Sequence, residues 1–552
     1  MSEALANAIS AHRAGDVDGA RTIALAGLAI DPDDVTLLHF LGMIEAKSGR
    51  LAAAQALFTR ATVASPEFGP ALVSLARLLD RSGDMAALAA LDRPAPAGAM
   101  GNEYLLLRAR ARDATGDTDG AATDHAELAA RNPGDRAIRL GAARALADAS
   151  RLGEAEHIYR DILAGDPADA EALLGLVGIF ESLSRSLELA GAFAAARKAG
   201  ASPPLVALGG AIALREAGDY PAALARLDGA RGLLPDATFQ QMRGDLADRA
   251  GEVDIAVAAF RAMNAADLAA TPQALDGVRR YRTELDAQLV ALDGPRPLPP
   301  PTERRAPPIF LVGFPRSGTT LLDTFLMGHA DLQVHEERPF LDAAAAVSND
   351  AIRQSLLDPG QIAAMRAAYW RALDRDTDRP NSLQVDKNPL ASARALLIAA
   401  MFPGARFLFA LRHPCDVVLS CFFTRFRLNW AVASFLSVED AAVTYDRVMR
   451  LWTASRERLA LDVHEVRYER LVADPEGVLR DVAEFAGIAF DPAMLDHRVV
   501  ARGRGLISSP SYAQVTAPLH GRSVGRWRRY REILDPVLPS LEPWCQRFGY
   551  DL

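Results

Sequence analysis

An octapeptide in the middle of the chain, GFPRSGTT at residues 313–320, has the residue types and spacing of a phosphate-binding loop. The general pattern of such loops is G-x-x-x-x-G-K-[ST], and Gly313, Gly318 and Thr320 occupy three of its positions. Thr319 stands where the pattern has the lysine that reaches a nucleotide's outer phosphates, and Arg316 lies inside the loop instead. The sequence therefore predicts an anion site whose charge comes from an arginine and backbone amides, and it disfavours ordinary ATP hydrolysis.

The loop lies between a predicted buried strand and a predicted helix, and this alternation continues along the second half of the chain. The helical patterns TLLDTFLMGH and PLASARALLIAAMF separate short apolar stretches. Strands that alternate with helices predict a central parallel sheet, which binds ligands beyond the carboxyl ends of its strands. The stretches that we interpret as strands are IFLVG (309–313), LQV (383–385), FLFAL (407–411) and VHEVRY (463–468).

The loop also carries a family resemblance. FPRSGTTLL is similar to the 5′-phosphosulfate loop of the sulfotransferases that use 3′-phosphoadenosine 5′-phosphosulfate (PAPS), and the resemblance covers most of residues 309–552. It is closest to the tyrosylprotein sulfotransferases and to bacterial proteins that join tetratricopeptide repeats to such a domain. The resemblance implies PAPS as co-substrate, no metal, a catalytic part for Arg316, and a donor site made of Pro315, Arg316, Ser317, Gly318, Thr319 and Thr320.

The stretch HEERPF, residues 335–340, follows a short apolar run, LQV at 332–334, and carries two adjacent carboxylates. A phenol or alcohol that attacks sulfur must lose its proton, and a carboxylate within hydrogen-bond reach can accept it. Resemblance to the tyrosylprotein sulfotransferases implies that Glu337 is the catalytic base, with Glu336 as the alternative. Arg338 departs from that family's placement of a substrate-contacting arginine, so the sequence leaves open whether tyrosine is the acceptor.

Two later stretches supply basic groups after predicted strands. VDKNPL (385–390) resembles the family's lysine-containing strand end, which implies that Lys387 stabilises charge on the bridging oxygen as the bond to sulfur breaks. FALRHPCDVVLSCFF (409–423) resembles the family's 3′-phosphate motif, which implies that Arg412 and Ser420 bind that phosphate. An arginine fork matches a phosphate bidentately, and a hydroxyl on the following helix adds a donor. This contact would distinguish PAPS from ATP, which has no 3′-phosphate.

The C-terminal stretches resemble the closing part of the same domain. Tyr468 stands at a position that is near the nucleotide in relatives, although a place in the core would explain it equally well. The resemblance implies that Ser511 is a catalytic residue near the sulfuryl group and that Arg526 binds the donor's phosphates. Most of the arginines in residues 522–531 are also explained by a solvated helix face.

The first half of the chain repeats at an interval of about 34 residues, the length of a tetratricopeptide repeat, which is a helix–turn–helix unit. Residues 41–66 resemble that family closely: Gly42 and Ala54 let two helices approach, Gly49 turns the chain, and Pro66 ends the second helix. We predict about eight such units, some degenerate, from residue 1 to about 265. Two series of marker residues carry the pattern. The first series is Pro32, Pro66, Pro133, Pro167, Pro203 and Pro235, and the second is Gly15, Gly49, Gly83, Gly116, Ser150, Gly218 and Gly251. A small or apolar residue stands five positions after each marker of the second series: Ala20, Ala54, Leu88, Ala121, Ala155, Ala223 and Ala256.

A helical pattern at 274–293 and the proline-rich stretch GPRPLPPPTERRAPP separate these repeats from the strands. Closely spaced prolines favour a stiff extended spacer. The sequence therefore predicts a tetratricopeptide solenoid with a C-terminal helix at 1–293, a linker at 294–308 and a PAPS-dependent sulfotransferase domain at 309–552. The predicted fold class is an all-α solenoid followed by a P-loop-like α/β domain with a central parallel sheet.

The composition is that of an ordinary globular protein, with 50% hydrophobic and 24% charged residues, and the net charge of −9 gives no indication of nucleic-acid binding. No stretch approaches 18 apolar residues and the N-terminus lacks a secretory pattern, so we expect a cytoplasmic protein without a membrane span. The cysteines have no CxxC spacing, which favours a reducing compartment. We expect no metal site, because these cysteines and the histidines near the motifs are not spaced as ligands: Cys415, Cys421, Cys545, His329, His335 and His413.

We therefore predict an enzyme, a PAPS-dependent sulfotransferase that acts on an acceptor hydroxyl. The concave surface of a solenoid suits extended peptides, which favours a protein or peptide acceptor, with tyrosine among the candidates. The open alternatives are a carbohydrate or lipid sulfotransferase whose solenoid recruits a partner or forms a homodimer, and a scaffold that binds the nucleotide without catalysis. Thr319 in place of lysine disfavours a P-loop kinase or ATPase, and the absence of a G-x-S-x-G elbow excludes a serine hydrolase of that type.

Overall fold

The structure is a computed structural model that describes residues 2–182, 185–292, 305–347, 358–426, 428–503 and 519–552. The chain packs as two compact units, Met1–Ile179 with Ala192–Ala201, and Phe180–Gly191 with Ser202–Leu552. Across these described ranges, no helix is both long enough and apolar enough to cross a lipid bilayer.

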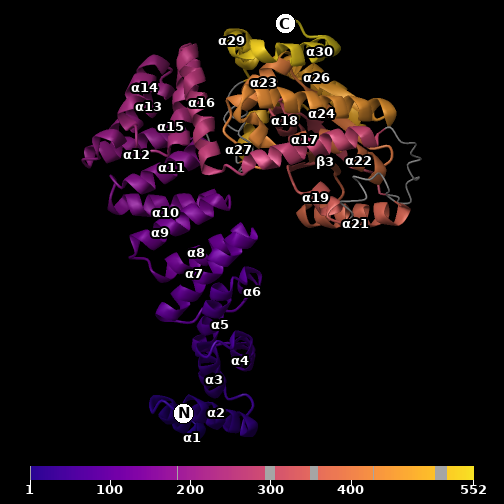
Figure 1. Ribbon diagram of the computed structural model, residues 1–552. Helices are drawn as coiled ribbons and strands as arrows, with labels where there is room; N and C mark the ends of the chain where they lie inside the picture. The colour runs from indigo at the N-terminus through magenta and orange to yellow at the C-terminus, as the bar shows by residue number, and fades with distance from the viewer. Residues whose placement is uncertain (1, 183–184, 293–304, 348–357, 427, 504–518) are drawn as a thin grey trace. The chain divides into compact units, whose positions relative to one another are not determined.

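Paired helices make up the first half of the chain (Figure 1). Neighbouring helices such as α3 and α4, or α15 and α16, pack against each other over much of their length. The predicted helix–turn–helix repeat is therefore confirmed. In the described residues the pairs are α1 Glu3–Arg13 with α2 Val17–Ile30, α3 Val35–Lys47 with α4 Leu51–Ala64, α5 Gly69–Ser82 with α6 Met85–Ala89, α7 Gly98–Thr115 with α8 Thr118–Arg131, α9 Arg136–Asp148 with α10 Leu152–Gly165, α11 Ala170–Ser182 with α12 Ser186–Lys198, α13 Pro203–Glu216 with α14 Tyr220–Leu227, and α15 Asp236–Ala250 with α16 Val253–Ala270.

The turns inside the pairs explain the second marker series of the sequence. Each marker adopts a left-handed backbone, which glycine enters without the steric cost that a side chain brings. Ser150 takes the same conformation at φ 69°. The small or apolar residues five positions after these markers are fully buried: Ala20, Ala54, Leu88, Ala121, Ala155, Ala223 and Ala256. The φ values of the glycine markers lie between 74° and 85° at Gly15, Gly49, Gly83, Gly116, Gly218 and Gly251.

A close approach between paired helices explains Gly42. A Cβ atom at Gly42 would lie 2.5 Å from Cε1 of Phe58 on the next helix, so any side chain there would push the two helices apart. The same packing recurs at Gly244, where a Cβ would lie 2.7 Å from Cε1 of Phe260. The predicted role of Gly42 in helix approach is confirmed.

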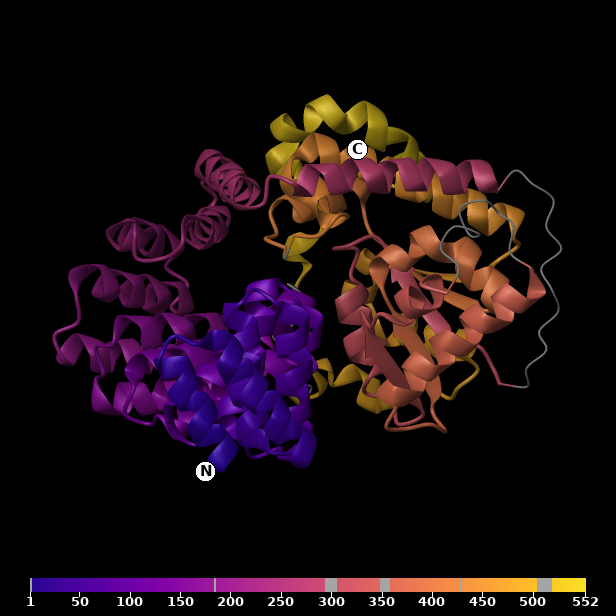
Figure 2. The same ribbon diagram turned by 60° about the horizontal axis from the view of Figure 1, so that its bottom comes forward.

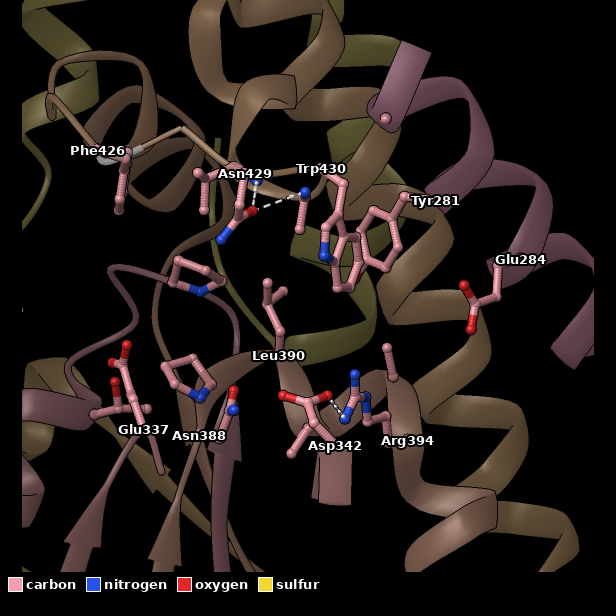
Figure 3. Close-up of a pocket in the computed structure, with 18 of the residues that line it drawn as sticks. Tyr281, Glu284, Glu337, Asp342, Asn388, Leu390, Arg394, Phe426, Asn429 and Trp430 are labelled. Atoms are coloured by element: carbon pink, nitrogen blue, oxygen red, sulfur yellow. Dashed lines mark hydrogen bonds and ion pairs between the residues drawn. The ribbon is translucent and has the colours of Figure 1, made fainter. Parts of the chain in front are cut away.

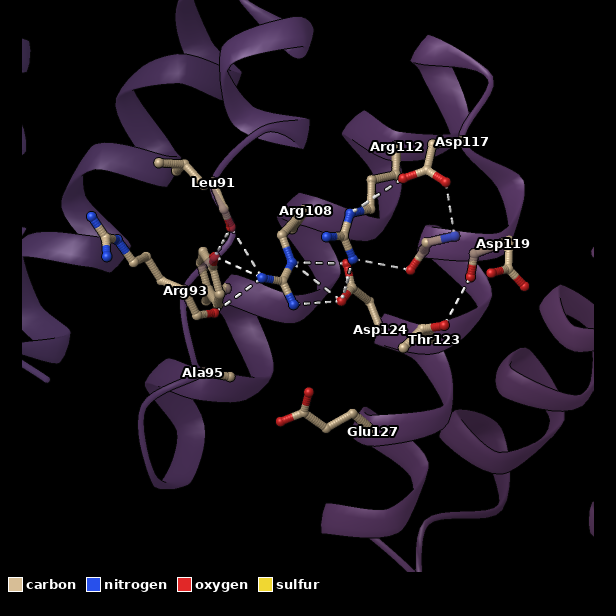
Figure 4. A network of polar contacts seen from close by, with 12 residues as sticks. Leu91, Arg93, Ala95, Arg108, Arg112, Asp117, Asp119, Thr123, Asp124 and Glu127 are labelled. Carbon is tan, nitrogen blue, oxygen red and sulfur yellow. Dashed lines mark hydrogen bonds and ion pairs between the residues drawn. The ribbon is translucent and has the colours of Figure 1, made fainter. Parts of the chain in front are cut away.

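A buried ion-pair cluster stabilises the part of the repeat where the proline marker is missing (Figure 4). Helix α6 has only 5 residues, and the chain that follows it is not helical. Arg108 donates to the backbone carbonyls of Leu91 and Arg93 at 3.0 Å and pairs with Asp124 at 2.6 Å. Arg112 approaches the same carboxylate at 2.9 Å. The cluster therefore ties the segment after α6 to helices α7 and α8.

We expect Asp124→Ala to lower the free energy of unfolding by about 3 to 5 kcal/mol, because it leaves two arginines without their shared counter-charge. The side chains of Asp124 and Arg108 are 1% and 7% exposed, so water cannot replace the lost partner. Urea unfolding followed by circular dichroism measures the change. Glu127→Ala is the matched control on the same helix. The side chains of Glu127 and its ion-pair partner Arg131 are 41% and 29% exposed, and ion pairs at the surface contribute little to the free energy of unfolding. Equal unfolding midpoints for the two variants would contradict the prediction.

The second half of the chain contains the predicted parallel sheet. Its five described strands have the order β2-β3-β1-β4-β5, and every neighbouring pair is parallel. Four strands lie where the sequence predicted them, whereas β2 had been interpreted only as a short apolar run before HEERPF. The predicted fold class is confirmed. The strands are β1 Ile309–Gly313, β2 Leu332–Glu336, β3 Leu383–Lys387, β4 Arg406–Leu411 and β5 Asp462–Arg467.

Helices follow the strands and cover the sheet (Figure 1). The helix expected over 389–402 begins with a 3-10 segment, Pro389–Arg394, before α22 starts at Ala395. The described helices of this part are α18 Thr319–Leu326, α19 Phe340–Ala345, α21 Pro359–Asp376, α22 Ala395–Met401, α23 Pro414–Phe422, α24 Val438–Arg458, α25 Tyr468–Ala473, α26 Pro475–Ala486, α27 His497–Gly503, α29 Arg531–Leu534 and α30 Leu538–Phe548.

Helices α13 to α17 belong to the same compact unit as the sheet. Helix α17, Ala274–Ala291, lies along α24 (Figure 1 and Figure 2), and Arg282 pairs with Asp440 at 2.8 Å. The ring of Phe260 on α16 stacks on Phe423 with centroids 4.2 Å apart. Packing therefore divides the chain near residue 202, whereas the predicted bounds 1–293 and 309–552 follow the change from repeats to strands. Most of the predicted linker at 294–308 lies outside the described residues.

Candidate functional site

The glycine loop connects the end of β1 to the start of α18. Gly318 precedes the helix with φ 100°, and Arg316 has φ 70°, a left-handed conformation that is costly for a residue with a side chain. The tight bend ends at the N-terminus of α18, where the helix dipole and the first backbone N–H groups favour a bound anion. The helix start predicted near Thr319 is confirmed.

Two glycines of the loop are required by close contacts. A Cβ at Gly318 would lie 2.7 Å from Cδ2 of Tyr468, and one at Gly313 would lie 2.7 Å from both the carbonyl oxygen of Ala410 and Oγ of Ser317. Tyr468 therefore packs directly on the loop. This contact holds Tyr468 beside the loop that the sequence predicts to bind the nucleotide.

Two arginines converge on the loop. Arg316 Nε donates to Ser420 Oγ on α23 at 3.1 Å. Arg412, directly after β4, donates from Nη1 to the carbonyl of Arg316 at 3.1 Å and from Nη2 to that of Ser523 at 2.5 Å. The guanidinium of Arg412 also lies 4.8 Å from the centroid of the Tyr468 ring. Four residues that the sequence predicted for the donor site are thus brought together.

Several cationic groups act on one another in this cluster. Burial lowers the pKa of Arg316 to about 10, and the charges of Arg412 and Arg526 act in the same direction. Arg412 Nε and Ser317 Oγ are buried polar atoms with no hydrogen-bond partner among the residues that the structure describes. Buried polar atoms are nearly always paired. The site therefore fits a ligand that carries phosphate- or sulfate-type oxygens.

A second cluster forms at the carboxyl ends of β2 and β3, which pair Glu336 with Lys387 in register. Lys387 Nζ lies 2.9 Å from Glu337 Oε1, 3.1 Å from Glu336 Oε1 and 3.3 Å from Asp323 Oδ2 of helix α18. The backbone N–H of Glu337 donates to the carbonyl of Lys387 at 2.7 Å. Glu337 also has a left-handed backbone, with φ 49°, which this bond helps to hold.

The members of this cluster differ in their access to solvent. Lys387 is fully buried; burial by itself would lower its pKa, but the carboxylates of Asp323, Glu337 and Glu336 raise it above the ordinary value. Its ammonium therefore stays charged. The side chain of Glu337 is 42% exposed and that of Glu336 12%. Of the two glutamates, Glu337 is the more accessible to solvent.

A cavity of about 890 Å³ connects the loop to Glu337 (Figure 3). Lys387 is fully buried and does not line it. The cavity is lined by the loop residues Pro315, Arg316, Gly318, Thr319 and Thr320, by Glu337, by residues of the 388–394 and 426–432 segments, and by helix α17. Its size is that of a typical small-ligand site.

One wall of the cavity is aromatic and comes from two distant parts of the sequence. The rings of Tyr281, on α17, and Trp430 meet edge to face with centroids 4.7 Å apart. A Cβ at Gly277 would lie 2.9 Å from Cα and Cβ of Trp430, so this glycine lets α17 approach. The Trp430 side chain remains 46% exposed. Figure 3 shows both rings above Leu390, opposite the Asp342–Arg394 ion pair.

Arg526 and Arg338 do not line the cavity. Arg526 pairs with Asp248 of α15 at 2.9 Å. Arg338 pairs with Asp376, and its side chain is 53% exposed. Ser511 lies outside the described residues.

The histidines near the motifs have structural partners. His329 lies between the carbonyl of Ala489 and the N–H of Asp331. His335 contacts Asp376 and Gln384 at 2.7 Å. These contacts fix both rings within the fold.

One group of possible metal ligands comes together only in the folded structure and was not visible in the sequence spacing. In the described residues, ligand atoms of His413, Cys415 and Cys545 all lie within 4.8 Å of one another. However, His413 Nδ1 accepts from the N–H of Cys415 at 3.2 Å, and Nε2 lies 2.9 Å from the carbonyl of Asp551. Both ring nitrogens are therefore engaged in the fold.

Sequence reasoning also missed Asp323, Tyr281 and Trp430. Asp323 had a visible signal, because it is a carboxylate within the apolar run TLLDTFL and it proves to be fully buried. The two aromatic residues gave no comparable signal. They become a wall of the cavity only through the packing of α17.

Known proteins are similar to the second half of the chain. Residues 307–492 match the model of the sulfotransferase family. Protein-tyrosine sulfotransferase 1 of Danio rerio is 25% identical over 260 residues, which are 44% of this chain and 72% of that protein. An uncharacterized protein of Aquifex aeolicus is 27% identical over 252 residues, which are 43% of this chain and only 32% of that protein.

Among solved structures, the sulfotransferase domain from the Synechococcus PCC 7002 olefin synthase is 22% identical to this chain. The match covers 47% of this chain and 100% of that domain, with a TM-score of 0.32.

Proposed function

From the premise that this chain joins tetratricopeptide repeats to a sulfotransferase domain, we propose that it transfers a sulfuryl group from PAPS to a hydroxyl of an acceptor. The observation that carries the proposal is the cavity that unites an anion-binding loop with a solvent-accessible carboxylate on a buried lysine. An anion site beside a base is what transfer from an activated sulfate to a hydroxyl requires.

The residues of the loop and of the arginine cluster fit the donor. PAPS supplies a sulfuryl group on a phosphate that leaves readily. The backbone amides at the start of α18 and Arg316 would hold the phosphosulfate, while Arg412 and Ser420 would hold the 3′-phosphate. The unpaired Arg412 Nε and Ser317 Oγ support this assignment.

Glu337 is proposed as the base. It takes the proton of the acceptor hydroxyl as the oxygen bonds to sulfur and the bond from sulfur to the phosphate oxygen breaks, which releases adenosine 3′,5′-bisphosphate. Protonation neutralises Glu337 and weakens its ion pair with Lys387. The charge of Lys387 then becomes available to stabilise the departing oxygen.

For the acceptor we propose a protein or peptide hydroxyl, with tyrosine as a candidate and the repeats as the recruiting surface. The protein-tyrosine sulfotransferase of Danio rerio supports this choice by its similarity. The aromatic wall of Tyr281 and Trp430 supports it as well, because a phenol ring can pack on an exposed indole. A carbohydrate or lipid hydroxyl is the alternative that the following experiment separates.

Labelled PAPS incubated with lysate of a strain that lacks this protein tests the function. We expect the added protein to transfer label to a protein band that protease removes. Label in a glycan or lipid fraction would refute the proposed acceptor, and no transfer together with no binding of adenosine 3′,5′-bisphosphate would refute the function.

We expect Trp430→Ala to raise the acceptor KM about 3- to 10-fold, since an aromatic pair contributes on the order of 1 kcal/mol. The KM for PAPS should stay unchanged. Tyr281→Phe is the matched control, because it keeps the ring on the wall and removes only a buried hydroxyl that has no hydrogen-bond partner in the described structure. Initial rates over a range of acceptor concentrations measure both variants. An unchanged acceptor KM in Trp430→Ala would contradict the prediction.

A further inference from the structure

One carboxylate on a repeat helix holds three side chains of the C-terminal region. Asp248 lies near the end of α15 with its side chain 11% exposed. It accepts from Arg526 Nε at 3.1 Å and lies 2.9 Å from Arg526 Nη2. Arg529 Nη2 donates to it at 3.0 Å and the hydroxyl of Tyr530 at 2.6 Å. The segment Arg526–Tyr530 is therefore anchored to α15.

The same segment is anchored on its other side to the donor site. Asp416, in the first turn of α23, accepts from the backbone N–H of Gly525 at 2.7 Å and of Trp527 at 2.8 Å. Arg412 of the anion cluster donates to the carbonyl of Ser523 at 2.5 Å. A displacement of the segment would therefore reach the residues that surround the loop.

The geometry of Arg526 indicates positioning for a ligand. Asp248 engages Nε and Nη2, and the guanidinium lies 4.9 Å from the ring of Phe423. Among the described residues, Nη1 has no hydrogen-bond partner. Arg526 is close enough to Arg316 for its charge to act there. A bidentate pair that leaves one arm unused fixes the guanidinium plane and keeps a donor for a phosphate.

A second ion pair of similar build shows what a purely structural contact looks like. Asp267 on α16 has its side chain 12% exposed and pairs with Arg425 at 2.9 Å through both Nε and Nη2. Arg526, unlike Arg425, is among the groups that act most on Arg316. The two aspartates thus match in burial and in having one arginine bound through Nε and Nη2, and they differ in their relation to the anion cluster.

We propose that Asp248 is a positioning residue for donor binding, which holds Arg526 so that its unused arm meets a phosphate of the donor. Helix α15 of the repeat region is then part of the support of the donor site. The inference rests on the proposed function, because it takes PAPS and adenosine 3′,5′-bisphosphate as the ligands. It extends that function to a residue well before the sulfotransferase match at 307–492.

The test compares Asp248→Asn with Asp267→Asn in the full chain. Calorimetry gives the Kd for adenosine 3′,5′-bisphosphate, and initial rates give kcat and the KM for PAPS. We expect Asp248→Asn to weaken both Kd and KM about tenfold, the effect of one lost charge-assisted contact, with kcat changed less than about threefold. Asp267→Asn should leave both constants within about twofold of the original protein.

A double-mutant cycle shows whether Asp248 acts through Arg526. In a protein that already carries Arg526→Gln, Asp248→Asn should raise the Kd for adenosine 3′,5′-bisphosphate less than about twofold. If Asp248→Asn does not fold, Tyr530→Phe removes one group that holds the carboxylate and should weaken Kd about threefold.

Three results would overturn the inference: unchanged or tighter binding in Asp248→Asn, equal losses in the two aspartate variants, or additive losses in the cycle. Each of these requires that the original protein binds the nucleotide. Absence of binding by the original protein is a different outcome and would refute the proposed function itself.

Discussion

Glu337→Gln is expected to lower the rate of sulfuryl transfer about 100- to 10,000-fold, the usual contribution of a general base. Glutamine keeps the shape of the side chain and an oxygen that can accept from Lys387, but it cannot take a proton from the acceptor. Asp323 and Glu336 stay beside the buried ammonium of Lys387, so the substitution leaves no buried charge uncompensated. We therefore expect the Kd for adenosine 3′,5′-bisphosphate and the unfolding midpoint to stay close to their original values.

The control for this prediction is Glu336→Gln, which changes a neighbour that contacts the same ammonium. Its side chain is 12% exposed and does not line the cavity among the described residues. We expect activity to fall less than about tenfold. Initial rates with labelled PAPS measure both variants. Loss of activity in Glu336→Gln together with normal turnover in Glu337→Gln would assign the base to the other carboxylate.

Lys387→Met is expected to affect both catalysis and stability. The rate should fall about 100- to 1,000-fold, the cost of removing one charge that stabilises the transition state. The free energy of unfolding should fall by about 3 to 5 kcal/mol, because Asp323 and the two glutamates lose the cation between them. Activity assays and urea unfolding measure the two effects separately.

A second substitution separates these two effects of Lys387. In the Lys387→Met background, Asp323→Asn removes a fully buried negative charge that has lost the cation beside it. We expect it to restore part of the stability and none of the activity. An unfolding midpoint of Lys387→Met equal to that of the original protein would show that the cluster does not stabilise the fold.

Local patterns in the sequence predicted most of the fold. The 34-residue markers predicted the helix pairs, since a left-handed turn residue and a small buried residue five positions later are requirements of a single helix hairpin. Apolar runs between helical patterns predicted β1, β3, β4 and β5. Strand β2 was not interpreted as a strand, although its first three residues, LQV at 332–334, repeat the LQV at 383–385 that predicted β3.

The order of the motifs also predicted most of the candidate site. The loop at 313–320, Glu337, Lys387 and Arg412 all follow strands of one parallel sheet, so topology alone brings them to the same edge. The loop glycines, the arginine inside the loop and the carboxylate pair each carry their chemistry in a few consecutive residues. Motifs of a few consecutive residues can be recognised in the sequence without knowledge of the tertiary contacts.

What the sequence by itself determined, then, is which elements form and which reactive side chains stand at their ends. Only the tertiary structure decided the partners: Asp323 joins Lys387, Asp248 holds Arg526, and Trp430 meets Tyr281. Secondary structure and turns depend on neighbours a few residues apart. Ion pairs and cavity walls depend instead on burial and on distances between segments far apart in the chain, which no local pattern encodes.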